Sequence, residues 1–90
     1  MLQQVPYKVF EIYHNINGYV MIKENRVTVT MNLLQSKIWQ VIDGTLTVEQ
    51  VIDKLQADNA ENIDRDKVLQ FINSAYSIGI LNYISEEWDV

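Results

Sequence analysis

Residues 26–44, RVTVTMNLLQSKIWQVIDG, contain the change from strand to helix that decides the fold. In the first part, Val27, Val29 and Met31 alternate with polar residues, which is typical of a strand with one buried face. Beyond Met31 the apolar residues recur at helical spacing. The chain therefore divides near Asn32 into an N-terminal part rich in strands and a C-terminal part rich in helices.

Two further strands are expected before this one, at residues 9–14 and 19–23. Asn17 and Gly18 between them favour the positive φ angles of a tight hairpin turn. With residues 26–31 they would form a three-stranded antiparallel meander, and such a small sheet needs cover on one face. The third strand comes last, so we expect it to have an unpaired edge.

Three helices are expected to supply that cover. Each expected start has a capping residue, and each of the first two has a glutamine three positions later, as in a capping box. A short apolar run after the last helix is read as a strand or an extended wing. The expected helix starts are Asn32, Thr47 and Asp64, the ends are Gly44, a loop at 57–63 and Gly79, and the apolar run is 80–84.

Composition predicts one small domain, residues 1–90, with an ordered core at about 8–84 and an acidic tail at 85–90. The expected fold class is α+β and winged-helix-like, with an N-terminal three-stranded antiparallel sheet followed by three helices. The net charge of −5 and the scattered cations disfavour nucleic acid as a partner. Without cysteine, a signal-peptide pattern or a long apolar run, the chain is expected to be cytoplasmic and not bound to membrane.

No residue pattern indicates catalysis. His14 is the single histidine and has no partner at a metal-ligand or catalytic-triad spacing. Asp64 and Asp66 are better explained by helix capping than by metal binding. We therefore expect a protein that is not an enzyme, with no catalytic residue, no metal and no cofactor.

Two surfaces remain for function. Leu69, Ile72 and Tyr76 form a second apolar stripe on the third helix, beside its core stripe. This stripe is read as the wall of a groove, although a wide core or a dimer contact explains its spacing equally well. The unpaired edge of the third strand offers main-chain groups to an extended peptide, which can add there as a further strand.

The order of several motifs resembles the PqqD family. Asn32, Ile38-Trp39, Asp43-Gly44 and Thr47 occur in the family's order, and the stretch Asp66–Ile72 followed by Gly79-Ile80-Leu81 is similar to its third helix and the end of that helix. Lys37 departs from the pattern, since alanine is common there. The likeness covers residues 8–84.

This resemblance implies a recognition element for ribosomally synthesised and post-translationally modified peptides. Such a domain is a non-catalytic adaptor that binds the leader segment of a precursor peptide by β-strand addition. It then presents the precursor to a separate modifying enzyme, such as a radical SAM enzyme, a cyclase or a leader peptidase. The expected leader-contacting residues are Val27, Thr28, Val29, Thr30, Met31, Arg65, Lys67, Leu69, Ile72, Asn73 and Tyr76.

Two other functions stay open at this point. A winged-helix regulator that binds nucleic acid would use its third helix to read a groove. That helix carries Arg65 and Lys67 near its start, but Asp64 and Asp66 alternate with them, which makes a poor surface for phosphate. A homodimer is the other alternative, because an open edge and an apolar stripe can also serve a second copy of the chain.

Overall fold

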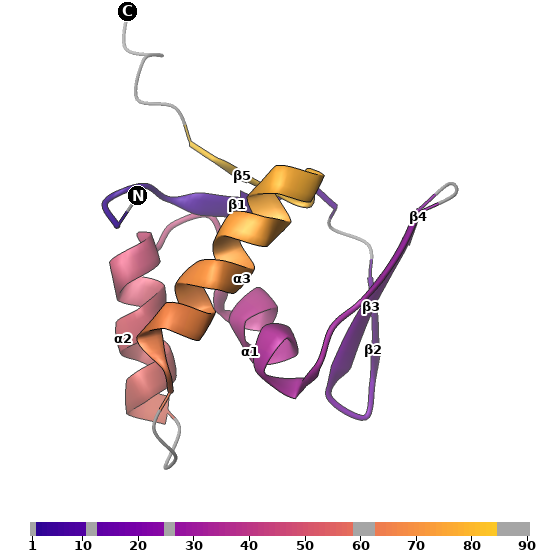
Figure 1. Cartoon of the computed structure of the whole chain (residues 1–90), viewed down its shortest axis with the longest axis horizontal. Helices are drawn as coiled ribbons and strands as arrows, with labels where there is room; N and C mark the ends of the chain where they lie inside the picture. The colour runs from indigo at the N-terminus through magenta and orange to yellow at the C-terminus, as the bar shows by residue number, and fades with distance from the viewer. Residues whose placement is uncertain (1, 11–12, 25–26, 59–62, 85–90) are drawn as a thin grey trace, which may run out of the picture.

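The computed structural model describes residues 2–10, 13–24, 27–58 and 63–84 of the 90-residue chain. They form an α+β domain in which an antiparallel three-stranded sheet precedes three helices, as predicted (Figure 1). A short C-terminal strand then returns to pair with the N-terminal strand. The elements are β1 (Pro6–Lys8), β2 (His14–Ile16), β3 (Tyr19–Glu24), β4 (Val27–Thr30), α1 (Leu33–Val41), α2 (Val48–Asp58), α3 (Arg65–Ile78) and β5 (Leu81–Tyr83).

The three-stranded sheet has the order β2-β3-β4. Ile16 and Tyr19 face each other at the end of the first hairpin, so that Asn17 and Gly18 form its two-residue turn. Their φ angles are 53° and 86°, as an Asn-Gly turn of this kind requires. The predicted hairpin is therefore confirmed, and β4 lies at one edge of the sheet.

The predicted first strand at residues 9–14 is wrong. The described strands on either side of it are β1, which ends at Lys8, and β2, which begins at His14; residues 11 and 12 lie outside the described residues. β1 pairs with β5, and this ladder continues where Val9 N–H donates to the Ile80 carbonyl at 3.0 Å. The main-chain groups of β5 need a partner, and Pro6–Lys8 supply it, so the N-terminal strand forms earlier in the chain than predicted and pairs with β5.

The helix starts follow the predicted capping chemistry. The Asn32 side chain accepts from Gln35 N–H at 2.8 Å, and the Gln35 side chain accepts from Asn32 N–H at 2.9 Å. Thr47 and Gln50 form the same reciprocal pair before α2. At α3 the Asp64 carboxylate accepts from the N–H two residues later.

The helix ends are also close to the prediction. Gly79 ends α3 with a φ of 88°, the left-handed conformation that glycine adopts without strain. α2 continues through Asp58, so its last two residues are helical where a loop was expected from residue 57. Among the described residues no helix combines the length and apolar character needed to cross a membrane.

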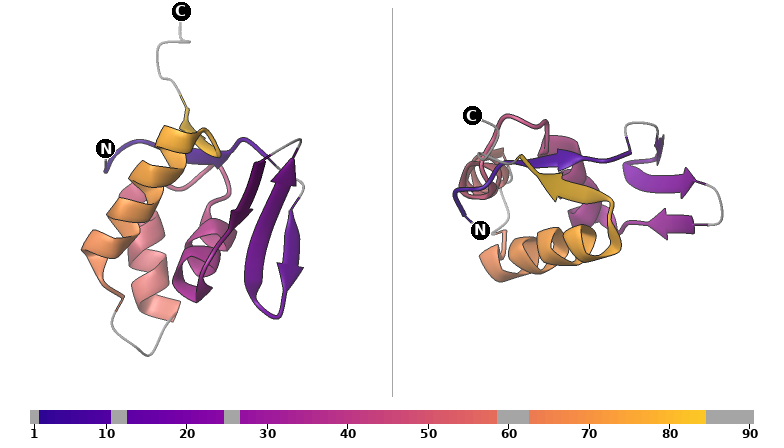
Figure 2. Two further views of the ribbon diagram at one scale, coloured as in Figure 1. Left: turned by 45° about the vertical axis from the view of Figure 1, so that its right-hand side comes forward. Right: turned by 90° about the horizontal axis from the view of Figure 1, so that it is seen from above.

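The core lies around α1, which contacts β3 on one side and α2 and α3 on the other (Figure 2). Ile38 and Trp39 of α1 are fully buried there. Ser36 is the one buried polar residue of the described core, and its hydroxyl accepts from Val20 N–H at 2.8 Å. α1 therefore fixes the sheet relative to α3 and sets the space between them.

Candidate functional site

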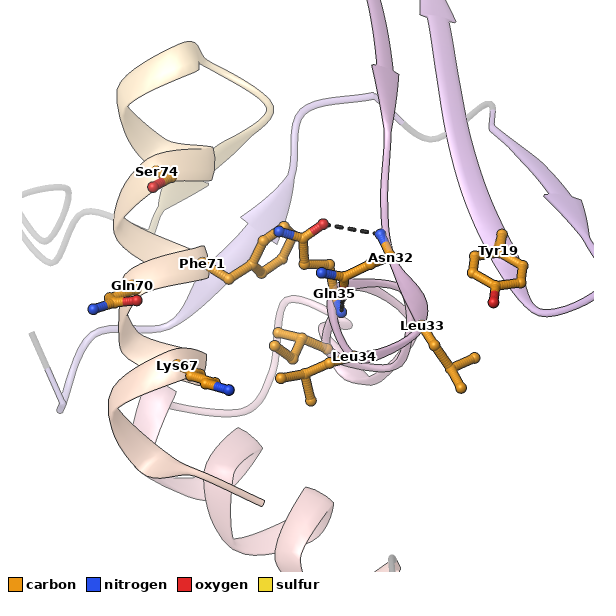
Figure 3. A pocket seen from close by; sticks show the side chains of 10 residues that line it. Tyr19, Asn32, Leu33, Leu34, Gln35, Lys67, Gln70, Phe71 and Ser74 are labelled. Carbon is orange, nitrogen blue, oxygen red and sulfur yellow. Dashed lines mark hydrogen bonds between the residues drawn. The ribbon is translucent and has the colours of Figure 1, made fainter. Parts of the chain in front are cut away.

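A groove of about 720 Å³ runs between α3 and the first turn of α1 and reaches the start of β3 (Figure 3). The capping box of α1 fixes one side, where the Gln35 amide and the Phe71 ring lie toward each other. The residues that line the groove are Tyr19, Asn32, Leu33, Leu34, Gln35, Ile38, Lys67, Gln70, Phe71 and Ser74.

The lining is largely neutral. Leu34 and Phe71 are half-buried and supply apolar surface along its length. Lys67 is exposed and is the one charged side chain among the described lining residues. In a protein with a net charge of −5, this groove is thus locally positive and free of lining carboxylates within the described part of the chain.

β4 ends at Thr30, two residues before Asn32, which lines the groove. The outer edge of this strand therefore leads to the groove. Met31 N–H donates to the Val20 carbonyl at 3.0 Å, so the main-chain groups of Met31 point toward β3. Main-chain directions alternate along a strand, so those of Val29 also point toward β3, while those of Thr28 and Thr30 point away. No strand among the described residues pairs with this outer edge.

Side chains of β4 contribute differently from its main chain. Thr28 and Thr30 are exposed, whereas Val29 is half-buried and Met31 is buried against the core. Val27 is the first residue of β4. Of the residues predicted at 27–31, the outward main-chain groups of the two threonines are therefore what the strand offers to a ligand, and Met31 serves the core.

On α3, the predicted apolar stripe does not line this groove, which corrects the expectation from spacing. Ile72 is fully buried in the core, and Leu69 is half-buried against it. Tyr76 packs on Tyr83 of β5, with ring centroids 4.9 Å apart. A helix presents different residues to its two sides, and Leu69 and Tyr76 lie on the side away from the groove.

The face of α3 that does line the groove begins with Lys67, which is also one of the residues expected to contact a leader peptide. Gln70, Phe71 and Ser74 follow at i+3, i+4 and i+7, the spacing of one helix face. Arg65 and Asn73 were also predicted as contacts. Both are exposed on α3 and lie outside the groove lining.

A smaller hollow lies beside β1, and Lys8 and Asp43 are among the residues that line it. The Lys8 ammonium is 5.3 Å from the ring centroid of Tyr13 and 5.6 Å from that of Trp39. Burial lowers the pKa of Lys8, and the nearby Asp43 carboxylate opposes this effect. The Asp43 pKa is itself lowered, first by its hydrogen bond with the Thr45 hydroxyl. These contacts connect the N-terminal segment to α1.

Groups that suggest catalysis or metal binding are not brought together among the described residues. His14 is exposed at the start of β2, and the Asp64 carboxylate is engaged as a helix cap. Within residues 2–10, 13–24, 27–58 and 63–84, no three metal-ligating side chains are grouped to hold an ion. The groove and the β4 edge are therefore the candidate site.

Comparisons of this chain with protein-family models, with curated proteins and with solved structures found no match.

Proposed function

We propose that this protein is a non-catalytic adaptor that binds an extended peptide at the outer edge of β4 and in the adjoining groove. The observation that carries the proposal is the direction of the main-chain groups of Thr28 and Thr30, which point away from the sheet. They can form a ladder with a fourth strand supplied by the ligand. Because the groove follows at the end of β4, side chains of the same ligand can enter it.

The ligand class that we propose is the leader segment of a ribosomally synthesised precursor peptide. The resemblance of residues 8–84 to the PqqD family supports this choice, and the edge strand beside α3 agrees with it. The adaptor then presents the bound precursor to a separate modifying enzyme or leader peptidase. Strand addition suits such a role, because main-chain bonds tolerate many sequences while a few side-chain contacts select one.

Hydrogen exchange tests the proposal residue by residue. The probe is the synthetic N-terminal segment of a short peptide encoded beside the gene for this protein. On saturation, the amides of Thr28 and Thr30 should become protected, because each gains an acceptor from the added strand. The amides of Val29 and Met31 already point toward β3 and should change little.

The alternation provides an internal control. Equal protection of all four amides would indicate general stabilisation of the domain rather than strand addition. If the peptide binds and the two threonine amides exchange as fast as before, the proposed mode of binding is wrong. A salt-dependent shift of duplex DNA by the purified protein would instead support the winged-helix regulator.

A further inference from the structure

We infer that the peptide-binding surface continues past β4 and around the first turn of α1 to a second apolar subsite, formed by Tyr19 and Leu33. Its occupant is a large apolar side chain of the same bound peptide. This inference rests on the proposed function, because it concerns the same ligand. It adds a site on the hairpin side of α1, away from the edge where the strand is added.

The side chains of this subsite are exposed although they are apolar. Tyr19 is 51% exposed and Leu33 is 47% exposed, and both line the far end of the groove (Figure 3). Ile16 is 57% exposed and pairs with Tyr19 across the hairpin, so these two side chains share one face of the sheet. The core is built from other residues, so these three remain available to a ligand.

The backbone under the subsite is fixed by local interactions. Asn17 and Gly18 form the tight turn before Tyr19, and a Cβ atom built on Gly18 would lie 3.7 Å from Leu33 Cδ1. Leu33 is the first residue of α1 and follows the capping residue Asn32. The hairpin tip and the helix start therefore lie close together, and binding there needs little reordering of the chain.

The geometry of β4 explains why one peptide would reach both places. Past Thr30 the main chain has no outward amide to offer, because Met31 N–H bonds to Val20 and Asn32 N–H bonds to Gln35. A peptide that follows β4 must leave the strand there. The groove begins at that point with Asn32 and runs on to Tyr19, so it provides a continuous path.

Charge and polarity define the segment that fits this path. Lys67 is the one charged residue among the described residues of the lining, and it lies on α3, across the groove from Asn32 and from the Tyr19 subsite (Figure 3). The occupying segment is thus neutral or carries a carboxylate for Lys67. It ends in a side chain of the size of leucine or phenylalanine, which Tyr19 and Leu33 contact.

The test uses the intact protein and a peptide chosen by it. The probe is the tightest binder from a phage-displayed library of random 12-residue peptides, made synthetically with a fluorescent label. We expect Tyr19→Thr and Leu33→Ala each to weaken binding by about tenfold, the usual effect of truncating an apolar anchor. Threonine keeps strand propensity and alanine keeps helix propensity, so both variants should fold. Ile78→Ala, at an exposed site on α3 outside the groove lining, should bind as the parent does.

Hydrogen exchange on the same complexes separates the two levels of the proposal. If Thr28 and Thr30 gain protection but both variants bind as tightly as the parent, the second subsite is wrong and the adaptor function stands. If no library peptide binds, or if bound peptide leaves both threonine amides unprotected, strand addition fails and the subsite fails with it. Protection that persists in Leu33→Ala together with weaker binding supports both.

Discussion

The Ser36 hydroxyl accepts a hydrogen bond from the main-chain N–H of Val20 at 2.8 Å, and both residues are buried. The same hydroxyl donates to the Asn32 carbonyl at 2.8 Å. Val20 is in β3, opposite the residue that follows β4, so an ordinary ladder would give its N–H a main-chain acceptor. Ser36 of α1 replaces that acceptor and thereby ties the helix start to the end of the sheet, next to the candidate site.

Replacing Ser36 by alanine should therefore destabilise the domain. The Val20 N–H would stay buried without an acceptor, which typically costs about 1–3 kcal/mol in the free energy of unfolding. Urea denaturation followed by circular dichroism measures this value. Ser77→Ala, at an exposed position of α3, is the control and should change it by less than about 0.5 kcal/mol. Equal stability of the two variants would mean that the Ser36 bond contributes nothing.

Proline substitutions test which main-chain groups of β4 are free. Thr28→Pro removes an N–H that points away from the sheet, so the variant should remain folded but bind a cognate peptide at least about tenfold more weakly. Val29→Pro removes an N–H directed toward β3 together with its ladder hydrogen bond, and should lower the free energy of unfolding by about 1–3 kcal/mol. Circular dichroism and peptide titration together check this pair.

The reversed pattern would contradict the assignment. A folded Val29→Pro variant beside an unfolded Thr28→Pro variant would mean that β4 pairs with β3 through the other set of residues. A folded Thr28→Pro variant with full affinity would place the ligand somewhere other than this edge.

Features fixed by neighbouring residues were predictable from the sequence. The capping box at Asn32 and Gln35, the turn at Asn17-Gly18 and the left-handed end at Gly79 each depend on a few adjacent residues. The pairing of β1 with β5 was not predictable in this way. It joins Pro6 to Tyr83, which are at opposite ends of the sequence, and no local pattern in either strand identifies the partner.

The face of α3 that lines the groove could not be identified from the sequence, again because tertiary packing decides it. On α3, the core stripe that contains Val68 and Ile72 has an apolar flank on each side, one with Leu69 and the other with Phe71. Periodicity shows that both flanks exist, but it does not show which one faces the sheet. Tertiary packing decides this, because β5 returns alongside Tyr76 and leaves the Phe71 flank to line the groove.

Replacing each of the two cations near the start of α3 by methionine tests whether binding depends on the cation that lines the groove. Lys67 lines the groove and Arg65 does not. With a probe peptide that carries one carboxylate, Lys67→Met should reduce the affinity by about three- to tenfold and weaken its dependence on salt. Arg65→Met removes the same charge two residues earlier on α3, outside the groove lining, and should change the affinity by less than about twofold. Titrations at low and high ionic strength measure both effects, and equal losses would indicate a general charge effect.

Replacing Tyr83 by phenylalanine should stabilise the protein, most of all at alkaline pH. The Tyr83 hydroxyl is buried without a hydrogen-bond partner among the described residues, and removing such a group is neutral or worth up to about 1 kcal/mol in the free energy of unfolding.

Burial also raises the Tyr83 pKa above its ordinary value of 10.0, with a smaller contribution from Tyr76. The folded state then holds this proton more tightly than the unfolded state does, so the stabilisation from the neutral phenol is complete below pH 10.0 and is lost as the pH rises through the folded-state pKa. The phenylalanine variant lacks this loss, and subtracting its stability from that of the parent cancels the titration of Lys8, which both proteins share. Urea denaturation between pH 7 and pH 11 should therefore give a difference that widens in favour of the variant. A difference that stays constant with pH would show that the phenol titrates alike in both states.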